Sequence, residues 1–167
     1  MILTGFQLRA ARRALNLHLE QLHQNTGISK VTLSRLENTI GNLEDISCSA
    51  KDAEMLLNYF NNNKLIFPNK STIALDVEVE PKSIKHNLTR FQFIVARAAI
   101  NLSQRTIAMH LNLTYSSIYQ FEGRPNTNYL KSYKITIESI INFFINLGVS
   151  FPNNKSVSIY PTHHVTH

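Results

Sequence analysis

Residues 102–122 read LSQRTIAMHLNLTYSSIYQFE, and residues 17–37 read LHLEQLHQNTGISKVTLSRLE. Each stretch predicts a short helix, a break and a second helix that starts at a capping residue. The break contains Gly27 in one stretch and Asn112 in the other, and these residue types adopt most readily the left-handed conformation that ends a helix. The hydroxyl side chains of Ser29 and Thr114 can then cap the next helix. This order is typical of a helix-turn-helix unit, and the chain contains it twice.

The internal repeat extends beyond these two stretches. A shift of 85 residues places Leu3-Thr4 on Leu88-Thr89. After a one-residue gap, a shift of 84 places residues 67–69 on residues 151–153, and both read Phe-Pro-Asn. A repeat of this length is too long for a solenoid unit, so the sequence predicts a duplicated small domain.

We assign residues 1–76 to copy 1, 77–86 to a linker, 87–162 to copy 2 and 163–167 to a tail. In each copy the pattern predicts four helices and a terminal β-hairpin, the first helix opening with a capping box. The expected fold class is therefore mainly α, with two tandem four-helix helix-turn-helix domains, each followed by a short hairpin. A lone hairpin is marginal in water, so each must pack on something.

The net charge of +6 is unevenly distributed. Residues 1–76 carry 8 Lys and Arg against 7 Asp and Glu, whereas residues 87–167 carry 7 against 2. A basic domain of this kind favours polyanions, with nucleic acid ahead of an anionic membrane. Cys48 is the only cysteine, which excludes an intrachain disulfide. No signal peptide or membrane-spanning run is visible, so we expect a cytoplasmic protein without a membrane partner.

The two stretches resemble the Cro/lambda-repressor-like, or Xre-type, helix-turn-helix family of bacterial and phage regulators. The resemblance covers nearly the whole chain apart from the linker and tail. It implies a sequence-specific, double-stranded DNA-binding transcriptional regulator, acting as a repressor at the nucleoid. It also implies two structural ion pairs, Arg12 with Glu37 and Arg97 with Glu122, each joining the first helix of a copy to the end of the third.

In this family the third helix enters the major groove with its N-terminal residues toward the bases. Lysine and arginine suit guanine, glutamine suits adenine, and valine can pack on a thymine methyl group, while further arginines suit phosphates. The DNA-binding candidates in copy 1 are Lys30, Val31, Thr32, Ser34 and Arg35. Those in copy 2 are Gln104, Arg105, Tyr115, Ser116, Ser117, Tyr119, Gln120 and Arg124.

Copy 1 departs from this pattern at the start of its second helix. His18-Leu19 stands where copy 2 has Ser103-Gln104, which weakens the cap and removes a polar side chain. Two interpretations of copy 1 stay open, a weaker contact with DNA or a contact with a protein partner. The corresponding alternative for the whole chain is an antitoxin-like module that binds a partner protein and autoregulates its promoter.

The expected mode of action is an internal dimer. One chain supplies both helix-turn-helix units, and the hairpins are the natural contact to set their spacing; a homodimer through the hairpins is a further option. We expect no enzyme activity, because the sequence has no glycine-rich phosphate loop and no nucleophile–base pair at a meaningful spacing. We also expect no metal or cofactor, since the histidines His163, His164 and His167 lie in the tail without a partner cluster.

Overall fold

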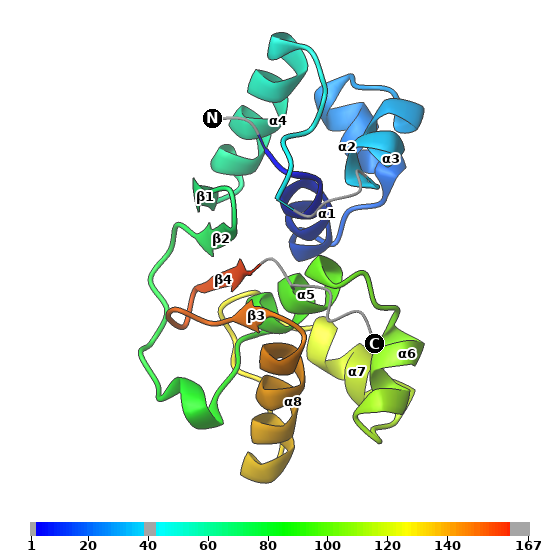
Figure 1. Cartoon of the computed structure of the whole chain (residues 1–167). Coiled ribbons are helices and arrows are strands. Elements are labelled where there is room, and N and C mark those ends of the chain that lie inside the picture. Colours follow the sequence, from blue (N-terminus) through cyan, green and yellow to red (C-terminus); the bar gives the residue numbers. More distant parts are fainter. Residues whose placement is uncertain (1–2, 39–42, 161–167) are drawn as a thin grey trace.

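The computed structural model describes residues 3–38 and 43–160 (Figure 1). The elements of copy 1 are α1 (Gly5–Ala14), α2 (Leu19–Thr26), α3 (Lys30–Glu37), α4 (Ala50–Asn62), β1 (Leu65–Asn69) and β2 (Thr72–Leu75). A short 3-10 helix, η1 (Ile84–His86), ends the linker. Copy 2 contains α5 (Arg90–Ala99), α6 (Gln104–His110), α7 (Tyr115–Glu122), α8 (Lys134–Asn146), β3 (Val149–Ser150) and β4 (Ser156–Ile159).

The fold is mixed rather than simply mainly α. Helices hold 52% of the described residues, but a four-stranded antiparallel sheet joins the two copies at their centre. The four helices and one hairpin expected in each copy are present. The proposed tail and the last two residues of copy 2 as assigned lie outside the described residues.

The first helix of each copy begins with the predicted capping box. The Gln7 Oε1 atom accepts from the Thr4 backbone N–H at 3.0 Å, and Gln92 does the same for Thr89 at 3.0 Å. Both glutamines also reach the hairpins. The Gln7 Nε2 atom donates to the Asn69 carbonyl at 2.7 Å, and its counterpart donates to the Asn153 carbonyl at 2.7 Å. The capping glutamine therefore fastens the hairpin of its own copy to its first helix.

The turn between the second and third helices follows the sequence prediction. Gly27 has φ of 72° and Asn112 has φ of 51°, both in the left-handed region. Ser29 and Thr114 then cap the third helices, each side chain accepting from a backbone N–H at 3.1 Å. His18 provides no side-chain hydrogen bond to α2, which agrees with the weaker cap expected there.

The two hairpins merge into one sheet with the strand order β1-β2-β4-β3. The inner strands pair antiparallel, with Ile73 opposite Val157 and Thr72 opposite Ser158. The hydroxyl groups of the latter two are hydrogen-bonded at 2.7 Å and buried. Each hairpin was expected to pack on another part of the protein, and part of that packing surface is the other hairpin. Among the described residues, the outer strands β1 and β3 are the edges of this sheet that could pair with another chain.

Helices α1 and α5 make the most extensive contact between elements of the two copies. Every residue of α5 is buried, from Arg90 to Ala99. One side of α5 packs on the elements of copy 2 and the other on α1, so the helix lacks the polar face that a surface helix shows. Small residues at the contact, such as Ala14, Ala98 and Ala99, allow the helices to approach closely.

The linker residues 77–86 lie against copy 2. The Tyr129 hydroxyl donates to the Glu80 carbonyl, the Asn154 Nδ2 atom donates to the Lys82 carbonyl at 2.9 Å, and His86 lies 2.5 Å from Glu138. The segment therefore has fixed contacts along its length. In the described part of the chain, no helix is both long and apolar enough to cross a membrane.

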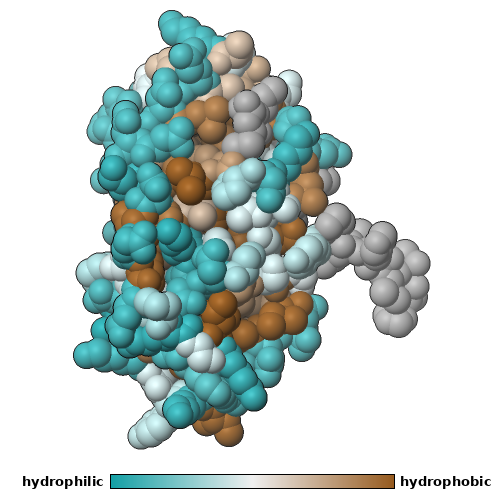
Figure 2. Space-filling view, turned by 90° about the vertical axis from the view of Figure 1, so that its left-hand side faces the viewer, coloured by the Kyte–Doolittle hydropathy of each residue, from teal (hydrophilic) through white to brown (hydrophobic). Residues whose placement is uncertain are grey.

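The second and third helices of each copy lie on one side of the molecule and the strands on the other. In Figure 1, α2 and α3 are at the upper right and α6 and α7 at the lower right, with the sheet at the left. Figure 2 views the strand side, where separate apolar patches interrupt a mostly hydrophilic surface. Dispersed patches of this kind are normal on a protein surface.

Because the copies share a sheet and a helix pair, we predict that they unfold together. Phe60 is fully buried in copy 1, and its ring packs edge-on against those of Tyr59 and Phe67. Phe60→Ala should lower the stability by about 3–5 kcal/mol and the melting temperature of the whole chain by about 10 °C. Calorimetry should show one transition with equal calorimetric and van't Hoff enthalpies.

The exposed neighbour Asn61 provides the control, and Asn61→Ala should leave the transition nearly unchanged. Two separated transitions in the Phe60→Ala variant, one of them at the original temperature, would show that the copies fold independently.

Candidate nucleic-acid interface

Each third helix is fixed to its first helix by a bidentate ion pair. The Arg12 Nε atom lies 2.5 Å from Glu37 Oε1, and its Nη2 atom donates to Oε2 at 2.7 Å. In copy 2 the corresponding distances between Arg97 and Glu122 are 2.5 and 2.9 Å. All four side chains are less than 10% exposed, so water competes little for these contacts. The pairs join the same positions that the sequence singled out.

The same arginines also hold the start of the second helix. The Arg12 Nη1 atom donates to the Leu17 carbonyl at 2.8 Å, and Arg97 donates to the Leu102 carbonyl at 2.6 Å. One guanidinium in each copy therefore contacts the first helix, the approach to the second and the end of the third. These contacts hold the second and third helices of each copy against its first helix.

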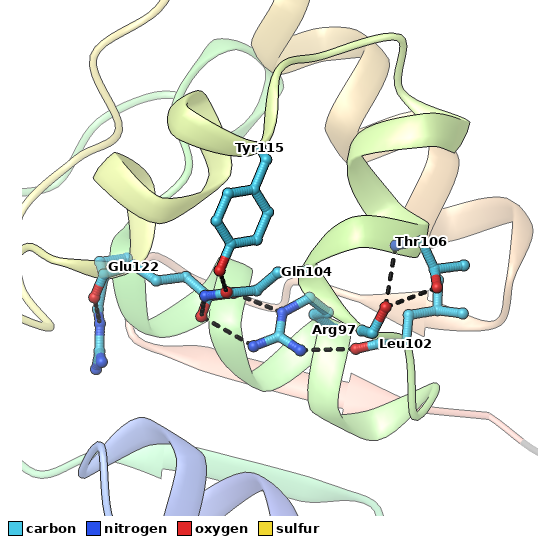
Figure 3. A network of polar contacts seen from close by, with 8 residues as sticks. Arg97, Leu102, Gln104, Thr106, Tyr115 and Glu122 are labelled. Atoms are coloured by element: carbon cyan, nitrogen blue, oxygen red, sulfur yellow. Dashed lines mark hydrogen bonds and ion pairs between the residues drawn. The ribbon is translucent and has the colours of Figure 1, made fainter.

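In copy 2 the ion pair extends to the exposed face (Figure 3). The Gln104 Nε2 atom donates to Glu122 Oε2 at 2.7 Å, and the Tyr115 hydroxyl donates to Gln104 Oε1 at 3.0 Å. Gln104 is thus a bridge between the ion pair and the start of α7, with both ends of its amide engaged. Leu19 occupies the corresponding place in copy 1 and cannot make this bridge.

The other DNA-binding candidates of copy 2 fall into two groups, exposed and half-buried. Ser116, Tyr119, Gln120 and Arg105 are exposed on α6 and α7. Ser117 is half-buried, and its hydroxyl pairs with that of the capping Thr114 at 2.8 Å. Arg124 is also half-buried, just beyond α7. The exposed group offers hydroxyl, amide and guanidinium side chains close together, the chemistry that base edges and phosphates require.

The copy 1 candidates form a less polar surface. Val31 is 80% exposed, and it lines an open hollow of about 480 Å³ together with Leu19 and Arg35. The Lys30 ammonium lies 2.5 Å from Glu20, an exposed contact that partly offsets its charge.

The remaining contacts of this surface are local. The Arg35 Nη2 atom donates to the Ser47 carbonyl at 3.2 Å. Thr32 pairs with the capping Ser29 through their hydroxyls at 2.9 Å, and Ser34 is half-buried. An apolar surface with cations at its edge is a different recognition chemistry from that of copy 2.

Two arginines that the sequence analysis did not single out lie between the copies. Arg9 and Arg90 each donate to the last carbonyl of their own third helix and to a carbonyl at the end of the other copy's first helix. The sequence signal that could have identified Arg90 is its place as one of two charged residues in the mostly apolar helix α5. Arg13 is an additional cation on α1, exposed to solvent.

No feature of the described residues indicates a metal or redox centre. Among them, no three His, Cys, Asp or Glu side chains gather closely enough to hold a metal ion. Partial burial, with a smaller effect of Asp52, raises the pKa of the Cys48 thiol and so disfavours the reactive thiolate. The three histidines of the tail lie outside the described residues.

Comparisons with protein-family models, with curated proteins and with solved structures find no match to this chain.

The Arg97–Glu122 pair leads to a stability prediction. Glu122→Ala removes the acceptor of three hydrogen bonds and leaves the Arg97 guanidinium nearly buried without its counter-charge. Breaking such a pair costs about 3–5 kcal/mol. Denaturant unfolding should show this loss as a lower midpoint.

Glu54→Ala removes a carboxylate that is exposed on α4 and serves as the control; it should change stability by less than about 0.5 kcal/mol. If the two variants unfolded at the same midpoint, the pair would contribute no stability.

Proposed function

We propose that the chain is a sequence-specific, double-stranded DNA-binding transcriptional regulator, a repressor that occupies an operator. The observation that carries the proposal is the presentation of α3 and α7 on one side of the molecule, each braced by a buried ion pair (Figure 1). Two helices held on one side of the molecule suit two half-sites on the same face of DNA. The centres of such half-sites lie one helical turn, about 34 Å, apart in the major groove.

In this proposal α7 reads bases mainly by hydrogen bonds. Gln120 and Ser116 are exposed and are not engaged in the Gln104 bridge, so they are the candidates for base edges. Gln120 suits the paired donor and acceptor of adenine. Arg105 is the candidate for a phosphate beside the groove.

The exposed surface of α3 favours a half-site with a different base sequence from the one that α7 would read. Val31 and Leu19 suit the thymine methyl group, the apolar feature of the major groove. Arg35, at the edge of the same hollow, suits guanine or a phosphate. The two recognition surfaces are thus chemically unequal, which favours an asymmetric operator read by a single chain.

A second function, the protein-binding module, is favoured by one observation in copy 2. Met109, Tyr133 and Ile135 are 82, 84 and 74% exposed. Ile135 also lines a hollow of about 200 Å³ with Leu111 and Leu113. A regulator that also neutralises a partner would need an apolar surface of this kind beside its DNA-binding face, and copy 2 offers one in addition to the apolar surface of copy 1.

Selection of random duplex DNA with the intact chain tests the proposal directly. We predict an asymmetric operator with two unlike half-sites about one helical turn apart, bound by one chain, because the exposed residues of α3 and α7 differ. Footprinting and mass measurement of the complex give the length and stoichiometry. Selection that enriches no sequence would contradict the proposal, and a palindrome bound by two chains would contradict the internal dimer.

Binding should depend strongly on salt. With about six phosphate contacts, the affinity should fall roughly 10³-fold between 50 and 200 mM salt, because each neutralised phosphate releases condensed counterions. Fluorescence anisotropy with the selected duplex at a series of salt concentrations gives the slope. An affinity that stays constant over this range would mean that phosphate contacts contribute little.

Substitutions should separate the base contacts from the phosphate contact. Gln120→Ala should relax the sequence preference at one or two base pairs, a loss of about 1–3 kcal/mol for a good bidentate contact. Arg105→Ala should weaken binding to all sequences alike and reduce the salt slope by about 1. Titrations against the operator and its single-base variants distinguish the two effects.

Asn142 is exposed on α8, and Asn142→Ala is the control that should bind like the original chain. A uniform loss for both Gln120→Ala and Arg105→Ala would show that Gln120 does not read bases.

A further inference from the structure

Arg9 connects the recognition helix of copy 1 to the first helix of copy 2. Its Nη1 atom donates to the Glu37 carbonyl at 2.6 Å. Its Nε and Nη2 atoms donate to the carbonyls of Ala98 and Ala99 at 2.7 and 3.2 Å. Glu37 is the last residue of α3, and the two alanines end α5. One guanidinium therefore spans the ends of two helices that belong to different copies.

Arg90 makes the reciprocal connection. Its Nε atom donates to the Glu122 carbonyl, the last of α7, at 3.0 Å. Its Nη1 atom donates to the Ala14 carbonyl, the last of α1, and to the Asn126 side chain. The recognition helix of copy 2 is thereby joined to the first helix of copy 1.

The two arginines are not equivalent in the repeat. The shift of 85 places Arg9 on Ile94 and Arg90 on Gly5. Each arginine nevertheless joins the end of the third helix of its own copy to the end of the first helix of the other copy. The duplication of the sequence therefore does not account for this reciprocal arrangement.

The chemistry of the contact explains why arginine is needed. The last carbonyls of a helix have no partner within it, and they carry the negative end of the helix dipole. Burial lowers the pKa of both guanidiniums, and the nearby carboxylates, Glu37 for Arg9 and Glu122 for Arg90, oppose that effect. A planar fork of donors can bridge two such ends at once, whereas a lysine ammonium is a single point charge.

We propose that Arg9 and Arg90 are positioning residues that fix the separation and relative orientation of α3 and α7, and so determine which half-site spacing the chain accepts. The consequence for DNA rests on the proposed function. We call these contacts of Arg9 and Arg90 the clamp. The clamp is a property of the free protein, so its effect on the distance between α3 and α7 can be measured with no DNA present.

The first experiment measures the clamp in the free protein. Nitroxide labels are attached to Val31→Cys and Ser116→Cys, both at exposed positions on the recognition helices, in a Cys48→Ser background. Dipolar spin spectroscopy should give one narrow distance distribution. Arg9→Lys and Arg90→Lys should broaden or shift it. Arg13→Lys, an exposed arginine on the same helix as Arg9, should leave it unchanged.

The second experiment measures spacing preference with the operator obtained by selection. One base pair is inserted or removed between the half-sites, which rotates one of them by about 34° relative to the other. The original chain and Arg13→Lys should lose roughly 10-fold in affinity, and Arg9→Lys or Arg90→Lys about 3-fold or less, because a loosened pair of helices adapts to either spacing. Phe60→Ala, destabilised away from the clamp, should keep the full preference.

The outcomes separate the two hypotheses. Broadened distances with a relaxed spacing preference support the clamp, and unchanged distances in folded Arg9→Lys overturn it whatever the chain binds. If Arg90→Lys does not fold, Arg9→Lys carries the test alone, because Arg9 is only half-buried. Failure of the original chain to bind any duplex would overturn the proposed function and the spacing role together, while the distance measurement would still decide whether the clamp exists.

Discussion

The packing of α1 against α5 is the constraint on which the rest of the structure depends. It buries α5 on all sides, brings the inner strands β2 and β4 into register and leaves the helix pairs α2–α3 and α6–α7 on the opposite side of the molecule. An exposed hairpin of this length would be marginal alone. Because the two hairpins form one sheet, each supplies the partner that the other lacks.

The buried and half-buried arginines lie where they fix the positions of α3 and α7. The ion pairs of Arg12 and Arg97 hold each third helix on its own first helix, and Arg9 and Arg90 hold it on the other copy. Buried charge is costly unless every donor finds an acceptor, and here carboxylates and helix-end carbonyls provide those acceptors. These arginines therefore fix the positions of α3 and α7 rather than adding to the surface charge.

The two copies have diverged in the surface that they present. Copy 2 extends its ion pair through Gln104 to Tyr115, leaving an exposed row of polar side chains on α7. In copy 1, Leu19 and Val31 make the corresponding surface apolar. Under the proposed function, a single chain then carries two reading chemistries in one rigid frame, which a dimer of identical chains cannot do.

The sequence by itself determined the local structure of both copies. Capping boxes at Thr4 and Thr89 and the left-handed turn residues Gly27 and Asn112 depend on short-range geometry, which a repeat makes visible twice. The Arg–Glu pairs join residues that are 25 apart in the chain, and the family resemblance, not local geometry, implied that they pair. Only the tertiary structure decided that the hairpins form one sheet, that the linker packs on copy 2 and that Gln104 turns inward. Nor could the repeat reveal the clamp, because Arg9 and Arg90 occupy unequal positions. These contacts join residues far apart in the chain, and no local pattern records which distant surfaces a helix or strand will meet.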